Sequence, residues 1–191
     1  MKTQYDLHAI VQHLRSRGDS PPTPSARCEV ERYLFNKWHG LQVVAAQVIA
    51  RWGGPESVVA LREWLMRSYA KRHWLDLRCE AAKCLARCIT AADAEWLLDL
   101  YFSLVGPTAR HELIPAIVVV PFDAVWPRFE VMLRTGTRDQ QAGVLQALGR
   151  MPDRAAILHQ LTSRLGTFDS EVQAAIRQRI ARWHELDSRQ R

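Results

Sequence analysis

Apolar residues recur with helical spacing over residues 41–65, LQVVAAQVIARWGGPESVVALREWL, with one interruption in the middle. The interruption, Gly53-Gly54-Pro55, is a strong signal for a helix break, because glycine ends helices in left-handed backbone and proline suits a first helical turn. The pattern predicts two helices joined by a tight turn. Helices joined this closely lie antiparallel.

The first of these helices returns along the chain as an internal repeat. An apolar anchor near the end of each copy recurs every 31 to 36 residues, at Ile49, Leu85, Ile117, Leu148 and Ile180. The position four residues before each anchor is also small or apolar, whereas the position seven before is polar: Gln42, Arg78, Arg110, Gln141 and Gln173. Repeats of this length are typical of helical solenoids, in which stacked units bury a shared core.

Partner helices are predicted between the anchors. Each begins at an acidic residue or a proline, which suits the unpaired N–H groups and the dipole of a helix N-terminus. Their predicted ranges are 56–67, 93–104, 122–134 and 153–165. The copy at 109–121 departs from the pattern, because Pro115 and the β-branched run after it favour a kinked or locally extended backbone.

The residues before the repeats form a separate part. Helical spacing predicts helices over 3–15 and 28–38, with the Pro- and Ser-rich loop 18–26 between them. The chain is therefore predicted to be all-α, an α-α superhelix of about five antiparallel helix pairs. N-terminal capping helices occupy 1–38, and the repeats with a C-terminal capping helix occupy 39–191, as one continuous domain.

The repeats resemble the HEAT-repeat family in its bacterial form, also seen as phycobilisome-lyase-type repeats. The matching positions, which spread over residues 40–185, are Ala45-Ala46, Ala81-Ala82, Ala147-Leu148-Gly149, Gly53-Gly54-Pro55-Glu56 and Pro152-Asp153. The resemblance implies that the second helix of each pair lines an inner, concave wall. It implies no single function, because such repeats serve unrelated proteins. A lyase-like chaperone for a chromophore is one function that it suggests.

Charge adds a candidate class of partner. The net charge is +6 with a sequence pI near 9.5, and 22 of the 26 basic residues are arginine. Arginine makes bidentate contacts with carboxylates and phosphates, so the excess suits an acidic partner. The same excess also follows from a GC-rich coding genome. The charge is spread along the chain rather than gathered in the stripe that is typical of nucleic-acid-binding proteins.

The four cysteines are spaced neither as a disulfide framework nor as a zinc site, and we expect buried free thiols: Cys28, Cys79, Cys84 and Cys88. No apolar run is long enough to cross a bilayer and no secretory signal is visible, so a cytoplasmic location is expected. No metal and no cofactor are predicted.

Cationic side chains of the second helices are the candidate binding site, on the inner wall that the resemblance implies. These groove candidates are Arg51, Arg78, Lys83, Arg87, Arg110, Arg150 and Arg182. The alternative is that each arginine only stabilises a helix C-terminus, by ~0.3–1 kcal/mol, and joins neighbouring repeats. A smaller candidate is a basic-aromatic loop cluster, which suits bases or acidic peptides. It consists of Lys71, Arg72, His73 and Trp74.

Catalytic motifs of the GxSxG, P-loop, HExxH and GxGxxG types are missing from the sequence. Trp96 with Asp99, and Trp74 with Asp76, imitate the Trp and Asp of a basic HEAT-like class of DNA glycosylases, but the spacing does not reproduce that site. We therefore expect a non-enzymatic scaffold or adaptor. It binds an acidic or extended segment of a protein partner in an arginine-lined groove. Nucleic-acid binding, with or without glycosylase-like repair, is the alternative.

Overall fold

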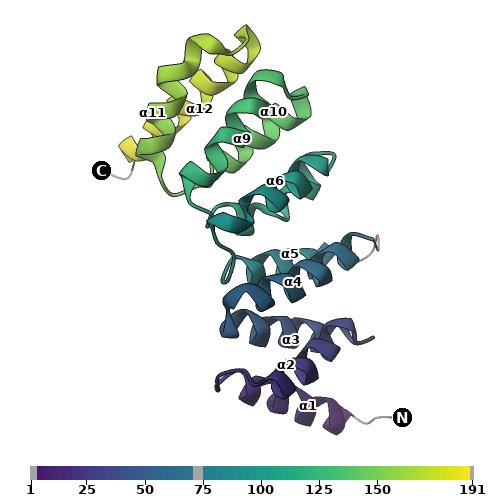
Figure 1. Cartoon of the computed structure of the whole chain (residues 1–191). Coiled ribbons are helices and arrows are strands. Elements are labelled where there is room, and N and C mark those ends of the chain that lie inside the picture. The colour runs from purple at the N-terminus through teal and green to yellow at the C-terminus, as the bar shows by residue number, and fades with distance from the viewer. Residues whose placement is uncertain (1–3, 71–74, 190–191) are drawn as a thin grey trace. The chain divides into compact units, whose positions relative to one another are not determined.

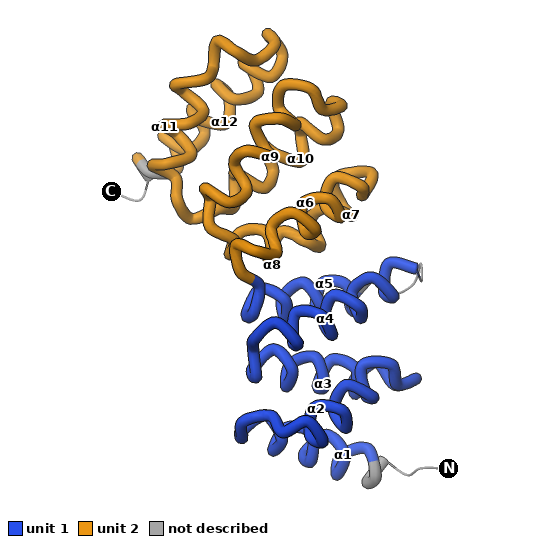
Figure 2. The backbone as a smooth tube through the Cα atoms, viewed as in Figure 1, with its two compact units in different colours: residues 1–89 blue, residues 90–191 orange. Residues whose placement is uncertain are grey.

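The computed structural model describes residues 4–70 and 75–189, and every regular element in these ranges is a helix (Figure 1). The predicted all-α class is confirmed. The chain divides into two compact units, residues 1–89 and residues 90–191 (Figure 2). The predicted division into capping helices (1–38) and repeats (39–191) is a different one, because it marks where the repeats begin. It stays a prediction.

The first unit is built around α3 (His39–Trp52), whose apolar face is buried. α3 packs against every other helix of this unit. These are α1 (Gln4–Arg17), α2 (Pro24–Glu31), the 3-10 helix η1 (Arg32–Phe35), α4 (Gly54–Tyr69) and α5 (Leu75–Leu85). α1, α3 and α5 therefore form one layer, and α4 covers α3 and α5.

The break at Gly53-Gly54-Pro55 has the predicted geometry. α3 ends at Trp52, and Gly53 and Gly54 have φ angles of 66° and 79°. These left-handed values favour glycine, because a Cβ would strain the backbone there. α4 begins at Gly54 with Pro55 in its first turn. The turn therefore forces α3 and α4 into contact.

The loop predicted at 18–26 is shorter than expected. α2 already begins at Pro24, and the Thr23 hydroxyl accepts a hydrogen bond from the Ala26 N–H at 3.2 Å. Thr-Pro is an N-cap followed by a first-turn proline, so the proline-rich stretch contains a helix start that composition alone does not show. The predicted helix 28–38 is correspondingly wrong at its end, since α2 gives way to η1 at Arg32.

The second unit also has two layers. α10 (Arg138–Leu148) packs against α7, α9 and α12, and α6 packs against α9. One layer thus holds α6 and α9, and the other holds α7, α10 and α12. The remaining bounds are η2 (Ala91–Asp93), α6 (Ala94–Ser103), α7 (Pro107–His111), α8 (Ile114–Ile117), α9 (Phe122–Thr135), α11 (Arg154–Arg164), η3 (Leu165–Thr167) and α12 (Ser170–Arg189).

The irregular repeat at 109–121 is a broken helix, the kinked alternative of the prediction. α7 ends at His111, and α8 begins at Ile114 with Pro115 in its first turn. A continuous helix would require the N–H of residue 115 to bond to the carbonyl of residue 111, and proline has no N–H. Ile114 and Ile117 are nevertheless buried, so the broken segment still fills the core.

The four cysteines are free, as predicted, but they differ in burial. Cys84 and Cys88 are buried, whereas Cys28 is exposed, so the expectation of a buried thiol is wrong for Cys28. α2 turns Ala26 and Val30 toward the core and leaves Cys28 on its outer side. Burial raises the pKa of the Cys84 thiol to about 12.

We expect the folded protein to react with iodoacetamide at Cys28 and not at Cys84. The thiolate is the reactive species, and burial suppresses it at Cys84. Peptide mass spectrometry after a short reaction in native buffer and in urea measures both sites. Cys84 should be labelled only after unfolding. Labelling of Cys84 in the native protein at the rate of Cys28 would contradict the buried placement.

Candidate functional site

The polar side chains seven residues before the anchors have a structural role. In four of the five repeats this side chain donates a hydrogen bond to a backbone carbonyl at the end of the preceding element. The donor and acceptor residues are Gln42 and Asn36 (2.5 Å), Arg78 and Ser68 (3.2 Å), Gln141 and Leu133 (3.2 Å), and Gln173 and Phe168 (2.8 Å). Carbonyls at helix C-termini lack partners within their own helix, so this column satisfies them and ties adjacent helices together.

Two predicted groove residues belong to this column. Arg78 is partly buried, and its guanidinium also lies over the Tyr69 ring, 4.9 Å from the centroid. Arg110 is only 2% exposed. Its Nη1 donates to the Asp139 carbonyl at 2.8 Å, and its Nη2 donates to the Asp139 carboxylate. The assignment of Arg110 to a binding groove is therefore corrected, because its own chain encloses the guanidinium.

The position two residues after the anchor is different, since its arginines are exposed. They are Arg51, Arg87, Arg150 and Arg182. Arg51 lies 3.7 Å from the Asp19 carboxylate. Within the described ranges the other three form no ion pair and no side-chain hydrogen bond. Lys83 is exposed but paired with Glu80 at 2.7 Å, and this hydrogen bond raises the pKa of Lys83.

The structure adds Arg179, which the sequence prediction missed. α12 packs on α10 and places Arg179 Nη1 2.8 Å from the position that a Cβ on Gly149 would take. Burial lowers the pKa of Arg179, and the like charges of Arg182 and Arg150 lower it further. Arg179 therefore lies within electrostatic reach of both Arg150 and Arg182. We call these three residues the arginine triad.

The second predicted site is the basic-aromatic loop cluster. Lys71, Arg72, His73 and Trp74 lie outside the described residues. Their assignment as a binding loop stays a prediction.

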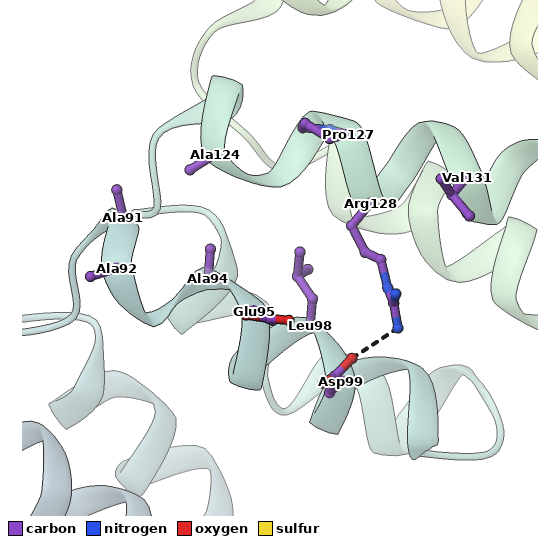
Figure 3. A pocket seen from close by; sticks show the side chains of 10 residues that line it. All are labelled: Ala91, Ala92, Ala94, Glu95, Leu98, Asp99, Ala124, Pro127, Arg128 and Val131. Carbon is purple, nitrogen blue, oxygen red and sulfur yellow. Dashed lines mark hydrogen bonds and ion pairs between the residues drawn. The ribbon is translucent and has the colours of Figure 1, made fainter.

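A pocket of ≈ 490 Å³ lies between α6 and α9 (Figure 3). Alanines and aliphatic side chains form much of its lining, and Arg128 reaches from α9 to donate to the Asp99 carboxylate on α6 at 2.8 Å. The Trp96 indole donates to Asp93 at 3.3 Å. Asp99 and Trp96, which imitate a glycosylase site in the sequence, thus have partners within their own layer. None of the groove candidates lines this pocket.

Residues 4–70 and 75–189 bring no three His, Cys, Asp or Glu side chains together as a metal site would require. None of the described helices combines the length and the hydropathy that a membrane-spanning segment needs. No protein-family model, curated protein or solved structure matches the chain.

Proposed function

We propose that this chain is a non-enzymatic HEAT-type scaffold, and that the arginines after the anchors bind an acidic segment of a protein partner. The observation that carries the proposal is that Arg87, Arg150 and Arg182 are exposed and, in the described part of the chain, have no carboxylate partner. Arginine forms bidentate contacts with carboxylates, so these side chains suit an acidic segment.

The arginines of α4, α9 and α11 behave differently. Arg67 pairs with Glu63 at 2.8 Å on α4, Arg128 pairs with Asp99 at 2.8 Å, and Arg164 pairs with Glu130 at 2.5 Å. These three arginines therefore have a carboxylate beside them, whereas Arg87, Arg150 and Arg182 have no ion pair in the described part of the chain. This contrast supports a role for the column toward a charged partner outside the chain.

Several contacts are needed for useful affinity. An exposed ion pair contributes only about 0.2–1 kcal/mol. Within the second unit, Arg150 at the end of α10 and Arg182 on α12 offer more than one such pair to an acidic segment, and their charge also speeds association at low salt. The resemblance to HEAT repeats supports this arrangement, because such arrays bind extended partners along their inner helices.

The charge reversal Arg87→Glu with Arg150→Glu is expected to abolish capture of the partner and to leave the helix content unchanged. Both side chains are exposed, so the substitutions disturb no packing. The measurement is retention of proteins from a nuclease-treated lysate of the native host on the immobilised chain. Quantitative mass spectrometry compares the variant with the wild type.

A matched control changes the same charge elsewhere. Arg67→Glu with Arg128→Glu reverses two exposed arginines of α4 and α9 that do not belong to the column after the anchors. This variant should retain the same proteins as the wild type. Equal retention by the Arg87 and Arg150 variant would refute the proposal.

Nucleic-acid binding is the second candidate, because the net charge of +6 attracts phosphates. It predicts duplex binding whose affinity falls steeply with salt concentration. Fluorescence anisotropy with a labelled duplex at low ionic strength tests it. No binding under those conditions eliminates this candidate.

A further inference from the structure

Arg179 occupies a position that is buried and apolar elsewhere in the repeats. The position one residue before the anchor holds Val48, Cys84, Ala116 and Ala147 in the other four copies, and all four are buried. Arg179 is the fifth member of this column and is partly buried on α12. A cation in an apolar column breaks the rule that the rest of the chain follows. Such departures are concentrated at functional sites.

The surroundings of Arg179 concentrate positive charge. Its guanidinium lies against Gly149, where any side chain would crowd it, because a Cβ would be only 2.8 Å from Nη1. Arg150 and Arg182 add two more cations. Over residues 4–70 and 75–189, the arginine triad has no ion pair and no side-chain hydrogen bond. Three cations are thus gathered, and among the described side chains none of them has an ion-paired carboxylate.

We propose that the arginine triad binds a phosphomonoester, carried by a phosphorylated serine or threonine in the partner's acidic segment. This inference rests on the proposed function, because it names the group through which the same partner binds. A phosphomonoester carries about −1.5 to −2 charges and three acceptor oxygens, which suits a compact group of guanidiniums. A single carboxylate carries one charge and leaves part of the triad unbalanced.

Nucleic acid fits the triad less well. A phosphodiester carries one charge, and successive phosphates of a strand are spread along its backbone, so they match a line of cations. The triad is compact instead, since Arg179 and Arg182 lie one turn apart on α12 and Arg150 follows Gly149 at the end of α10. The geometry therefore favours one dianionic group.

The alternative role of Arg179 is structural, because it lies at the C-terminus of α10, where a cation is favourable. In the described ranges, however, Arg179 donates no hydrogen bond to the carbonyls of that helix end. The two roles predict opposite effects on stability. Arg179→Gln removes repulsion among three cations and should leave the unfolding midpoint unchanged or raised, whereas loss of a helix cap would lower it.

Isothermal titration of the full chain with a short phosphoserine peptide, at low ionic strength, tests the site. The matched probes are the same peptide with serine, the same peptide with glutamate, and a single-stranded DNA oligonucleotide. The phosphoserine peptide should bind, and Arg179→Gln should weaken it at least about tenfold, because a charge-assisted hydrogen bond is lost. Both other peptides and the oligonucleotide should bind at least about tenfold more weakly than the phosphoserine peptide.

Two further variants make the result specific. Gly149→Ala keeps every charge and suits the right-handed helical backbone at that residue, where φ is −65°, but its Cβ displaces the Arg179 guanidinium. It should weaken phosphoserine binding severalfold. Arg177→Gln is the control, because it removes the same charge from an exposed position of α12 where Arg177 binds Gln173. It should bind like the wild type.

Three outcomes overturn the inference. They are no binding of the phosphoserine peptide, binding that survives Arg179→Gln, and equal or tighter binding of the glutamate peptide or the oligonucleotide. Partner capture tests the proposed function independently of the phosphoserine peptide. If Arg87→Glu with Arg150→Glu abolishes partner capture while the phosphoserine peptide does not bind, the acidic partner stands and the phosphate is refuted.

Discussion

Asp139→Ala is expected to lower the free energy of unfolding by about 1–3 kcal/mol, because it leaves the buried Arg110 guanidinium without the carboxylate that accepts its hydrogen bond. Arg110 is 2% exposed, so the substitution leaves a buried cation without its carboxylate, although water can reach the 42% exposed position of Asp139. The same carboxylate accepts the Gly106 N–H at 3.3 Å, so its removal also frees the turn before α7. Urea unfolding followed by far-UV circular dichroism measures the loss.

Arg110→Met should cost less than Asp139→Ala, although it removes the same ion pair. Methionine fills much of the buried volume without a charge, and the Asp139 side chain, 42% exposed, remains in contact with water. The free energy of unfolding of Asp139→Asn should lie between those of the wild type and Asp139→Ala, since an amide oxygen still accepts a hydrogen bond from Arg110. A larger loss in Arg110→Met than in Asp139→Ala would show that packing, rather than the unpaired charge, dominates.

The ion pair also sets a dependence on pH. The hydrogen bond from Arg110 lowers the pKa of Asp139 in the folded state. The stability that this bond supplies is therefore present at neutral pH and is lost as the pH falls through the lowered pKa. Unfolding at neutral and at acid pH should show a smaller acid loss for Arg110→Met than for the wild type.

The helix order could be predicted from the sequence because it depends on local signals. Apolar spacing, the Gly53-Gly54-Pro55 break and Pro115 each act within one or two turns of a helix. The Thr23-Pro24 helix start was overlooked because the prolines around it are typical of a loop. Its own signal, an N-cap residue before a first-turn proline, is nevertheless local.

The site could be predicted only in part. Whether an arginine is buried and paired or exposed and unpaired depends on residues that are distant in the sequence. Arg110 and Arg150 are both predicted groove residues, yet Arg110 is buried and pairs with Asp139, 29 positions along the chain. Periodicity places both on a helix and does not show whether a partner comes from another element. Arg179 was missed for the converse reason, since a column of apolar residues predicts core rather than a site.

The polar column, seven residues before the anchors, shows which information the repeat pattern contains. A glutamine or arginine seven residues before each anchor recurs because a helix end in the preceding element needs a hydrogen-bond donor, and Gln141 and Gln173 meet that need. Recurrence of a polar residue in repeats is therefore evidence for a repeated structural contact. The arginines after the anchors recur as well, but without such contacts, and this difference separates the two columns.

Trp64→Ala is expected to destabilise the first unit by about 3–5 kcal/mol, because it empties the space of a fully buried aromatic side chain. Trp64 is 0% exposed, and its indole N–H donates to Gln42 Oε1 at 2.9 Å. Trp64→Phe should cost less, about 1–3 kcal/mol, since it keeps most of the apolar volume but leaves the Gln42 oxygen without a donor. Urea unfolding followed by circular dichroism measures both losses.

The Trp64 result separates packing from hydrogen bonding when it is combined with Gln42→Leu. In the Trp64→Phe background the Gln42 oxygen is already unpaired, so removing it should cost less than in the wild type, with a coupling of about 0.5–3 kcal/mol. Trp38→Ala is the comparison, because Trp38 is 50% exposed and its loss should lower stability clearly less than the loss of Trp64. Strict additivity of the Trp64 and Gln42 substitutions would mean that their contact contributes nothing.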